Sequence, residues 1–491
     1  MLLIFALRSA GPLLWGLSGL TVLIICLLII ADNRMPQSTF AWIFFILLFP
    51  ILGLVAYWFL GRSHKIFSRE RQLAHLELAG PLIQALKPLM DHEYDYISMI
   101  QHEKPGSFRR RLLYMIFRNS ASSLTAYNQV EILQDASEKY PRLLDDIRRA
   151  RHSIHLEYFI WTEDEFTCEL RDALIERAQA GVRVRALVDQ SSFNFSSAYL
   201  AGLYAAGVDI RPYRVFMRLD RLHTLNYRSH RKIAVIDGQV GYVGGLNLDR
   251  EQLPGRHPVG SWRDTHLRMD GEAARVLQAS FLVSWFNTTG ENLVEPDYYP
   301  RLEPGSRPFI PVQITQGGPD SDWKAMQQLY FFMIMDARSS VYIQSPFFIP
   351  DESLLDAIRA AALAGVDVRI MCQPRGGSYQ VPYRAAYTYY ADVVRAGARV
   401  YLYQDGYFHA KTIQIDSAIC AIGTANMDVR SFYLNYETMA VIYDEAIARE
   451  LEADFLQDQK HCVEWRLEEY LKTPWPSRLL DSLYRLASPV M

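Results

Sequence analysis

Two short segments of this chain carry the same set of polar residues and glycine at identical offsets. A single His-x-Lys sequence arises often by chance, whereas two copies with matching downstream residues indicate a duplicated site. Imidazole, ammonium and amide side chains together supply a nucleophile, a proton donor and charge stabilisation, which is the set that phosphoryl transfer requires. The matching residues are His230, Lys232, Asp237, Gly244 and Asn247 in the first copy and His409, Lys411, Asp416, Gly423 and Asn426 in the second.

Both copies begin in strand-like sequence, and this decides which side chains share a face. Residues two apart on a strand point to the same side. His230 therefore projects with Lys232, and His409 projects with Lys411. We take these four residues as the catalytic centre of the site. In the expected reaction one imidazole attacks phosphorus, while the other protonates the leaving alcohol and then deprotonates the incoming one.

The aspartates and asparagines further along each copy have other expected roles. Asp237 and Asp416 complete the motif and are kept among its catalytic candidates, but each lies seven positions after its histidine. An odd spacing turns a side chain to the opposite face of an unbroken strand, and Asp-Gly is typical of a hairpin turn, so a structural role is favoured. Asn247 and Asn426 can donate hydrogen bonds to a phosphoryl oxygen, and we expect them to bind substrate.

A reacting imidazole needs a carboxylate at its second nitrogen to hold the correct tautomer. Two acidic residues lie at matching places downstream of the copies, Asp264 and Glu437, and we predict that they orient the histidines. Pairing with an arginine is an equally good interpretation of either carboxylate. Three arginines could bind phosphate or simply pair with acids, and pairing is the preferred interpretation: Arg228, Arg263 and Arg430.

The composition limits the partners and the compartment. The 491 residues suffice for two or three domains, and a net charge of −3 provides no basic field for nucleic acid. The five cysteines show no Cys-x-x-Cys spacing, which is typical of a reducing compartment. No cluster of histidines, cysteines or carboxylates has ligand spacing, so we expect no metal and no cofactor.

The first sixty or so residues differ from the rest in being almost without charge. Two apolar stretches, Gly11–Ala31 and Phe40–Leu60, are each long enough to cross a ~30 Å hydrocarbon core as a helix. The short linker between them predicts a tight transmembrane hairpin over residues 1–62. Four basic residues follow the second stretch against one in the linker, so the rest of the chain is expected in the cytoplasm.

Beyond a connector expected at residues 63–120, the chain repeats an alternation of strands and helices. The two halves run over 121–305 and 306–491, and each contains an apolar strand, a helix ending in Ala-Gly, another strand and then one motif copy. This alternation predicts an α/β sandwich with a largely parallel sheet in each half. Half a motif in each predicts a pseudo-twofold, face-to-face arrangement with both histidines in one cleft.

The two copies resemble the His-x-Lys-x4-Asp signature of the phospholipase D superfamily. Flanking sequences extend the resemblance, namely Asn226-Tyr-Arg-Ser-His, Trp262-Arg-Asp-Thr-His and Gly423-Thr-Ala-Asn-Met-Asp. Together with the N-terminal hairpin that ends in Pro-Ile-Leu-Gly, they are similar to the bacterial cardiolipin synthases of the two-span type. The resemblance covers nearly the whole chain. Thr424 stands where many members have serine, and it keeps the hydroxyl.

The resemblance implies two phospholipase D-like α/β sandwich domains in a pseudo-twofold arrangement after a transmembrane helical hairpin. It implies an integral, multi-pass protein of the bacterial inner membrane whose catalytic domains are cytoplasmic, with a homo-oligomer left open. The implied reaction transfers a phosphatidyl group between two phosphatidylglycerol molecules through a phosphohistidine and gives cardiolipin and glycerol. By family analogy His230 attacks and His409 is the acid and base, although the near symmetry of the halves does not order them.

Other functions stay open from the residues alone. A membrane-bound phospholipase D would hydrolyse the lipid, and its products would distinguish it. A tethered phosphodiesterase or nuclease is disfavoured by the balanced charge, since a polyanion demands a basic stripe. A lipid-binding scaffold with a decayed site is disfavoured because both copies are intact. The amphipathic C-terminal stretch Trp475–Leu486 predicts a helix that lies on lipid headgroups or packs on the second half.

Overall fold

The computed structural model divides the chain into two compact units. The first unit is formed by residues 1–68 and 216–226, and the second by residues 69–215 and 227–491. Apart from residues 216–226, both repeated halves therefore belong to the second unit. The described residues are 22–31, 36–57, 78, 80–91, 96–98, 108–213, 227–256, 258, 260–300, 306–374, 380–486 and 488.

The described part of the first unit is helical but interrupted. Residues 22–31 form a helix, which is followed by α2 (Pro36–Leu48) and α3 (Pro50–Ala56). The continuous span expected over Phe40–Leu60 is broken between α2 and α3, because Pro50 has no N–H to donate to the preceding turn. The remaining residues of the two expected spans lie outside the described part of the chain. None of the helices described is both long enough and apolar enough to cross a membrane.

Among the described residues, one continuous sheet of sixteen strands runs through both halves of the second unit. Its first-half strands are β1 (Leu124–Gln134), β2 (Ser153–Tyr158), β3 (Arg183–Asp189), β4 (Asp209–Tyr213), β5 (Arg228–Ser229), β6 (Lys232–Ile236), β7 (Val240–Gly244) and β9 (Thr265–Gly271). Its second-half strands are β10 (Phe309–Gly317), β11 (Ser340–Gln344), β13 (Asp367–Cys372), β14 (Arg399–Tyr403), β16 (Thr412–Ile415), β17 (Ile419–Gly423), β19 (Asn435–Ile442) and β20 (Cys462–Glu464).

The strand order of this sheet reflects the repeat in the sequence. Outward from the central antiparallel pair β1–β10, the order is β9, β7, β6, β2, β3, β4 on one side and β19, β17, β16, β11, β13, β14 on the other. The two orders correspond strand by strand, as a pseudo-twofold arrangement requires. The halves are joined edge to edge through β1 and β10, which corrects the expectation of face-to-face packing.

The sheet is mixed, which corrects the expectation of a largely parallel one. Parallel neighbours are β2–β3–β4, β11–β13–β14 and the short pair β5–β19. The two motif copies instead form antiparallel hairpins, β6–β7 and β16–β17. Their turns need left-handed backbone, which Asp237 (φ 54°) and Gly238 (φ 62°) supply in one half and Asp416 (φ 51°) and Ser417 (φ 50°) in the other.

Helices cover the sheet and bury its side chains. The strands of the first half contact α6 (Asp135–Arg149), α7 (Glu165–Gln179), α8 (Ser197–Ala205) and α9 (Glu272–Thr289). Those of the second half contact α10 (Ala325–Asp336), α11 (Glu352–Leu363), α12 (Gln380–Arg395) and α14 (Glu445–Gln459). One core is common to both halves and joins Ile233 and Leu267 to Ile422 and Ala440. This shared apolar core holds the two motif copies in constant relative positions.

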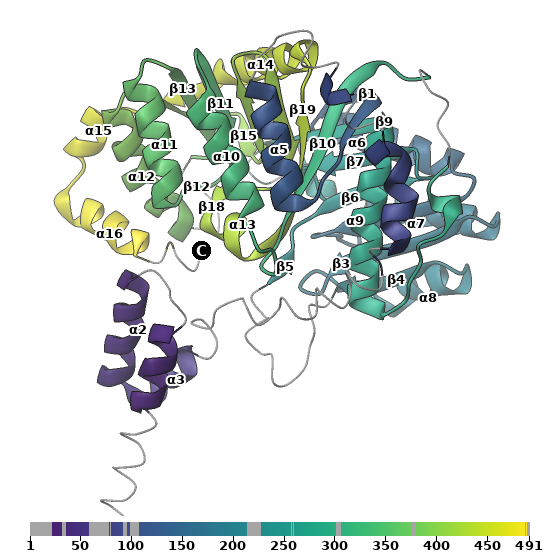
Figure 1. Ribbon diagram of the computed structural model, residues 1–491, viewed down its shortest axis with the longest axis horizontal. Coiled ribbons are helices and arrows are strands. Elements are labelled where there is room, and N and C mark those ends of the chain that lie inside the picture. Colours follow the sequence, from purple (N-terminus) through teal and green to yellow (C-terminus); the bar gives the residue numbers. More distant parts are fainter. Residues whose placement is uncertain are drawn as a thin grey trace, which may run out of the picture. The chain divides into compact units, whose positions relative to one another are not determined.

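The helix α5 (Phe108–Ser120) lies beside α10 in the second half (Figure 1). It also contacts β10, and its Leu112 and Ile116 are buried in the second-half core. This part of the expected connector at 63–120 is therefore packed into the folded body. In the sequence α5 precedes the first half, yet it packs against the second half.

The C-terminal helix α16 (Trp475–Arg485) packs along α12. Its Arg485 donates to Asp392 at 2.9 Å, and Arg384 of α12 donates to its buried Asp481 at 3.1 Å. On the outward side Trp475 and Leu483 remain exposed. The helix therefore packs on the second half, as one of the two interpretations predicted, and still presents an apolar face to its surroundings.

Candidate active site

Each histidine of the motif is held by a strand of the opposite half. The strand β5 pairs with β19, and the N–H of His230, the next residue, donates to the carbonyl of Tyr436 at 3.0 Å. In the same way β15 (Gly406–Phe408) pairs with β8 (Ser261–Arg263), and the N–H of His409 donates to the carbonyl of Arg263 at 2.8 Å. These crossed strand pairs bring the two motif copies together.

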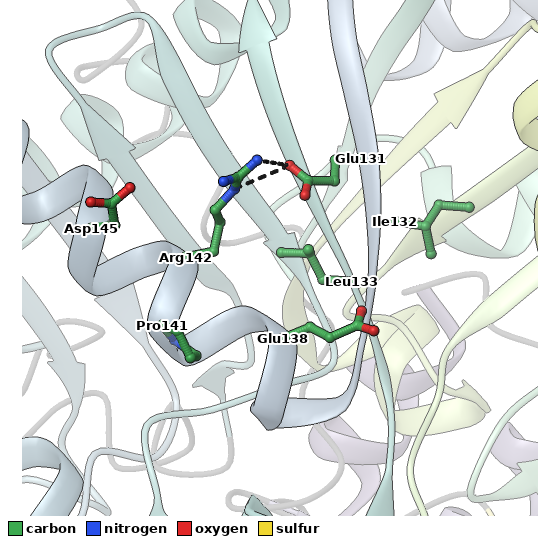
Figure 2. A pocket seen from close by; sticks show the side chains of 7 residues that line it. All are labelled: Glu131, Ile132, Leu133, Glu138, Pro141, Arg142 and Asp145. Atoms are coloured by element: carbon green, nitrogen blue, oxygen red, sulfur yellow. Dashed lines mark hydrogen bonds and ion pairs between the residues drawn. The ribbon is translucent and has the colours of Figure 1, made fainter.

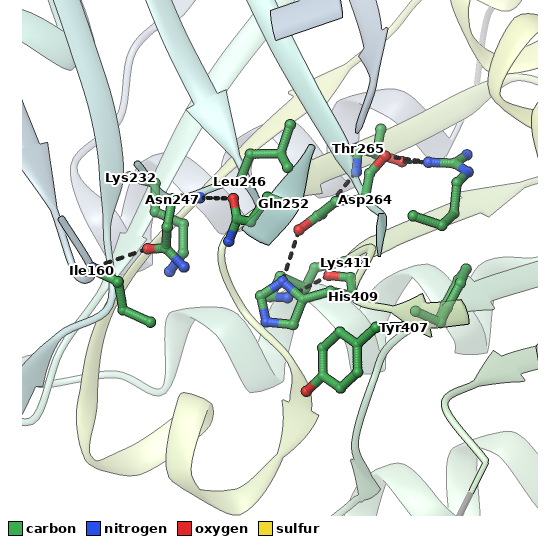
Figure 3. Close-up of polar contacts among 12 residues, drawn as sticks. Ile160, Lys232, Leu246, Asn247, Gln252, Asp264, Thr265, Tyr407, His409 and Lys411 are labelled. Atoms are coloured by element: carbon green, nitrogen blue, oxygen red, sulfur yellow. Dashed lines mark hydrogen bonds and ion pairs between the residues drawn. The ribbon is translucent and has the colours of Figure 1, made fainter. Parts of the chain in front are cut away.

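The carboxylates predicted to orient the histidines also cross between the halves. Nδ1 of His230 lies 2.9 and 3.0 Å from the two carboxylate oxygens of Glu437. Nδ1 of His409 lies 2.7 Å from Oδ2 of Asp264, a contact that Figure 3 draws. The sequence indicated the two carboxylates but not this exchange, which follows from the crossed strands. Because a carboxylate accepts the hydrogen bond from Nδ1, Nε2 of each ring is left to attack phosphorus or to transfer a proton.

Both histidines line one cavity of about 930 Å³, so the prediction of a shared cleft is confirmed. Asn247 and Asn426 line it as well. Its walls are otherwise aromatic, apolar and charged, with contributions from Phe159, Ile160, Arg228, Asp249, Glu251, Trp262, Phe347, Tyr383, Tyr407, Asp428, Arg430 and Asn435 among others. A cavity of this size with a few convergent polar groups is typical of a small-molecule site.

The motif lysines are fully buried beside the histidines. Nζ of Lys232 donates to the carbonyl of His230 at 2.7 Å, and Nζ of Lys411 donates to the carbonyl of His409. Burial lowers the pKa of Lys232 to about 7 and that of Lys411 to about 8, although nearby carboxylates oppose the shift. Without an anion in the cavity these ammonium groups therefore lose their protons far more readily than ordinary lysines.

The imidazoles are neutral at pH 7 in this environment. Burial lowers the pKa of His409 to about 3, with a further contribution from Lys411, and it also lowers the pKa of His230. Burial alone would raise the pKa of Asp264, but Lys411 and His409 outweigh it and lower that pKa. The pKa of Glu437 is lowered in the same way by His230. Neutral rings beside ionised carboxylates are the state that nucleophilic attack requires.

The two asparagines are anchored alike by residues that the sequence analysis missed. The N–H of Asn247 donates to Gln252 at 2.9 Å, and the N–H of Asn426 donates to the hydroxyl of Ser431 at 3.1 Å. The side-chain oxygen of Asn247 accepts from the N–H of Ile160 at 3.1 Å (Figure 3). Gln252 and Ser431 lie at the same distance along the chain from their asparagines, and this spacing could have revealed them.

Lys139 is a second residue that the motif did not reveal. Its ammonium group lies buried on α6 and donates to the carbonyls of Leu246 at 2.9 Å and Asn247 at 3.1 Å. Burial lowers its pKa well below the ordinary value. Lys139 therefore holds the main chain at Asn247. No signal in the sequence could have indicated this role, because the lysine lies on a helix far upstream.

Asp237 and Asp416 lie at hairpin turns, outside the set of residues that line the cavity. The carboxylate of Asp237 accepts from the N–H groups of residues 151–153 at 2.7–2.9 Å. That of Asp416 accepts from the N–H groups of residues 338–340 at 2.8–3.2 Å. Neither is among the residues that line the cavity. Each ties a hairpin turn to the start of the neighbouring strand, which is the structural role that the odd spacing favoured.

The three arginines near the motif have different surroundings. Arg263 is buried and pairs with Asp458 through contacts of 2.9 and 2.8 Å, as the preferred interpretation predicted. Arg228 and Arg430 line the cavity. Beside His409 the wall is aromatic, with the rings of Trp262 and Tyr407 only 4.5 Å apart and that of Trp262 5.3 Å from the imidazole.

A second hollow of about 600 Å³ lies over β1 and α6 (Figure 2). Its cation, Arg142, is already paired with Glu131 at 3.1 Å, and it contains no motif residue. The carboxylates of Glu138 and Asp145 also line it, so it does not favour an anionic ligand. In the described part of the chain, no group of three or more histidine, cysteine, aspartate or glutamate side chains is placed to hold a metal ion.

A repeated half-sheet, a shared cavity and crossed histidine–carboxylate pairs together define a phospholipase D-like protein. The same fold occurs in the crystal structure of phosphatidylserine synthase from Haemophilus influenzae Rd KW20. That structure aligns with a TM-score of 0.59 and 16% identity over 78% of this chain and 100% of its own. At this level of identity the alignment supports the fold alone.

Within that class the chain belongs to the cardiolipin synthase family. The family model for the cardiolipin synthase phospholipase D-like domain matches residues 143–281 and 330–459, one match in each half. A phospholipase D-nuclease N-terminal model matches residues 20–62. The chain is 38% identical to the cardiolipin synthase of Geobacillus kaustophilus over 97% of its length and 93% of the relative's. It is 36% identical to the major cardiolipin synthase ClsA of Bacillus subtilis over 96% of its length and 97% of the relative's.

Proposed function

We propose that this protein joins two phosphatidylglycerol molecules into cardiolipin and releases glycerol. The observation that carries the proposal is the pair of neutral imidazoles, each with a carboxylate from the opposite half, in one headgroup-sized cavity. Two buried lysines lie behind them and can neutralise a phosphodiester. The full-length match to relatives named cardiolipin synthases supports the same substrate.

In the first step Nε2 of one histidine attacks the phosphorus of a phosphatidylglycerol. A nitrogen–phosphorus bond forms and the bond from phosphorus to the glycerol oxygen breaks. That oxygen takes a proton from the other histidine and leaves as glycerol. Binding of the anionic phosphodiester favours the protonated form of this second ring, whose carboxylate partner stabilises the imidazolium. Family resemblance assigns the attack to His230 and the proton transfer to His409.

In the second step the headgroup hydroxyl of another phosphatidylglycerol gives its proton to the acid–base histidine. The resulting oxygen attacks phosphorus, the bond to nitrogen breaks, and the electron pair returns to the imidazole. The products are cardiolipin and the original neutral histidine. We assign Asn247 and Asn426 to binding of the phosphoryl oxygens, because both line the cavity. Asp264 and Glu437 hold the tautomers throughout.

We further propose that the N-terminal segment anchors the protein in the bacterial inner membrane as a helical hairpin, with the catalytic halves in the cytoplasm. The two apolar stretches of the sequence and the N-terminal family match over 20–62 support an anchor. The exposed apolar side chains of α16, including Trp475 and Leu483, support contact with a lipid surface. An anchor keeps the acceptor lipid concentrated at the cavity and so favours transfer over reaction with water.

The product test uses full-length protein and vesicles that contain phosphatidylglycerol labelled in the glycerol headgroup and in the acyl chains. We expect free glycerol and a four-chain lipid in equal amounts. A phospholipase D would instead release glycerol together with phosphatidate, and this outcome would contradict the proposal. A nuclease would leave the lipid unchanged and cleave labelled DNA added to a parallel sample.

The pH dependence of kcat/KM should reflect the buried lysines. A lysine is charged when protonated, and the pKa values of Lys232 and Lys411 are lowered to about 7 and about 8. Their charge is therefore lost as the pH rises through this range, and kcat/KM for cardiolipin formation should fall there. A pH–rate profile on vesicles of constant composition measures this. A kcat/KM that stays level to pH values typical of ordinary lysine titration would contradict the assignment.

Gly245 allows Asp264 to approach His409. A Cβ atom at this position would lie 1.9 Å from Oδ1 of Asp264. We expect Gly245→Ala to displace the carboxylate and to lower kcat by about 10²-fold through misplacement of the ring. Steady-state kinetics on folded protein checks the effect.

The matched control for this change is Gly202→Ala in α8. An added Cβ there would meet Ile175 at 3.5 Å, an ordinary contact, and kcat should stay within about threefold of wild type. Wild-type kcat in Gly245→Ala would show that the Asp264–His409 contact does not govern the reaction.

A further inference from the structure

The two sides of the cavity are related by the repeat but differ in chemistry. The spacing that separates His230 from His409 also separates Arg228 from Tyr407, and Glu251 from Arg430. All four of these flanking residues line the cavity. Because the strands of the two halves cross at the site, Arg430 of the second half lies with Arg228 on the side next to His230. The corresponding positions next to His409 are occupied by the phenol of Tyr407 and the carboxylate of Glu251.

The two arginines are held on adjoining elements. Arg228 lies on β5, opposite Asn435 of β19, and Arg430 lies on α13 (Val429–Tyr433), which directly precedes β19. Burial lowers the pKa of Arg430; Asp428 opposes this, and the positive charge of Arg228 lowers it further. Asp428 itself is buried, and burial raises its pKa to about 6, so it is still ionised at neutral pH and offsets part of this positive charge. An anion that contacts both guanidinium groups would relieve the repulsion between them.

The proposed reaction requires two phosphates in the cavity at once. The phosphatidyl group carries the first, and the acceptor phosphatidylglycerol brings its own phosphodiester, separated from the attacking hydroxyl by one glycerol. Each buried lysine donates to the main-chain carbonyl of its own histidine, so we assign the charge of the lysine pair to the reacting phosphate. This leaves the second phosphate without a partner among the motif residues.

We propose that Arg228 and Arg430 form a second phosphate site that binds the phosphodiester of the acceptor lipid. The inference rests on the proposed function and adds to it the group that selects the acceptor. A guanidinium binds phosphate through two parallel hydrogen bonds, so the pair can orient the acceptor as well as attract it. An acceptor without a phosphate, such as free glycerol or water, gains nothing from this site. The arginine pair thus favours lipid transfer over hydrolysis.

The test compares two reactions of the same enzyme on phosphatidylglycerol vesicles. One is cardiolipin formation, and the other is the exchange of labelled free glycerol into phosphatidylglycerol, which reverses the first step and needs no second phosphate. We expect Arg228→Gln and Arg430→Gln each to lower cardiolipin formation by about 10- to 100-fold, the loss of one charge-assisted phosphate contact. Glycerol exchange should stay within about threefold of wild type.

Arg250→Gln is the matched control, because Arg250 is exposed beside Glu251 and pairs loosely with Glu165 at 3.8 Å. It should leave both reactions unchanged. Should a glutamine variant prove unstable by thermal melting, Arg228→Lys and Arg430→Lys are used in its place. They keep the positive charge and lose only the two parallel hydrogen bonds of the guanidinium group. They should lower cardiolipin formation several-fold and retain exchange. Equal losses of both reactions in the folded variants would overturn the acceptor site.

A further experiment distinguishes binding of the lipid phosphate from binding of free phosphate. Inorganic phosphate is added at constant ionic strength. If the site serves the acceptor, phosphate should compete with cardiolipin formation in the wild type without changing glycerol exchange. If phosphate changes glycerol exchange in the wild type but not in the glutamine variants, the arginines bind free phosphate. This result would overturn the proposal. A wild-type enzyme that exchanges glycerol but makes no cardiolipin would instead contradict the proposed function itself.

Discussion

Replacement of His230 or His409 by alanine is expected to lower the rate of cardiolipin formation by at least about 10⁴-fold, the size of effect seen when a nucleophile or its acid–base partner is removed. Both rings line the same cavity. In the proposed mechanism neither can replace the other, because one forms the bond to phosphorus while the other moves the proton. Initial rates of four-chain lipid formation on labelled vesicles, with thermal melting to verify folding, measure the effect.

His461→Ala is the control for these two variants. His461 also places Nδ1 against a carboxylate, that of Asp405, but its side chain is 43% exposed and does not line the cavity. The same chemical change there should alter the rate by no more than about threefold. Substantial synthesis by folded His230→Ala or His409→Ala would refute a mechanism that uses both rings.

The second large effect is expected from the carboxylates that cross between the halves. Asp264→Asn and Glu437→Gln keep the shape of the side chain, but an amide can donate to Nδ1 and so favour the tautomer with its proton on Nε2. This tautomer has no lone pair on Nε2 for attack or proton removal, and we expect kcat to fall by about 10³-fold with KM little changed. The measurement is the separation of kcat from KM on vesicles of varied phosphatidylglycerol content.

Asp405→Asn, at the exposed histidine pair outside the cavity, is the matched control and should leave kcat within about threefold of wild type. The crossed geometry adds a sharper expectation. A protein that contains the first half alone has His230 without Glu437 and should be inactive, whereas two separately expressed halves that reassemble should regain activity. Normal kcat in either amide variant would mean that the Nδ1 contacts do not set the tautomer.

Much of the site could be predicted because its motif occurs twice in the sequence. Duplicated spacing identified His230 and His409 with their lysines, and strand parity separated these from the aspartates. The carboxylates Asp264 and Glu437 could be found because each lies downstream of one motif copy and a reacting imidazole needs such a partner. These inferences needed only local geometry, which the sequence determines directly.

The crossed pairing could not be predicted, because it depends on how strands from different halves meet. Nothing near His230 indicates that its N–H will bond to Tyr436, or that Glu437 will follow on the same strand. The mixed sheet was missed for a related reason. The alternation of strands and helices favours parallel neighbours. It outweighed the hairpin signal at Asp237-Gly238, where β6 and β7 pair antiparallel.

Lys139, which holds the main chain at Asn247, was missed because no sequence pattern indicates it. Lys139 reaches Asn247 from α6, and a buried lysine has no distinctive sequence neighbourhood. The asymmetry of the cavity was available from the same spacing that revealed the motif. Arg228 and Tyr407 occupy equivalent positions, but their difference acquires meaning only when both are found to line one cavity.

The most direct measurement is the capture of the covalent intermediate. Phosphatidylglycerol labelled in its phosphate is mixed with enzyme, quenched in alkali to preserve phosphohistidine, and the peptides are analysed by mass spectrometry. We predict a lipid-phosphate adduct on a single histidine, His230 or His409, that disappears when that residue is replaced by alanine. An active enzyme that forms no adduct, or one that carries it on a residue outside the two motif copies, would contradict the account.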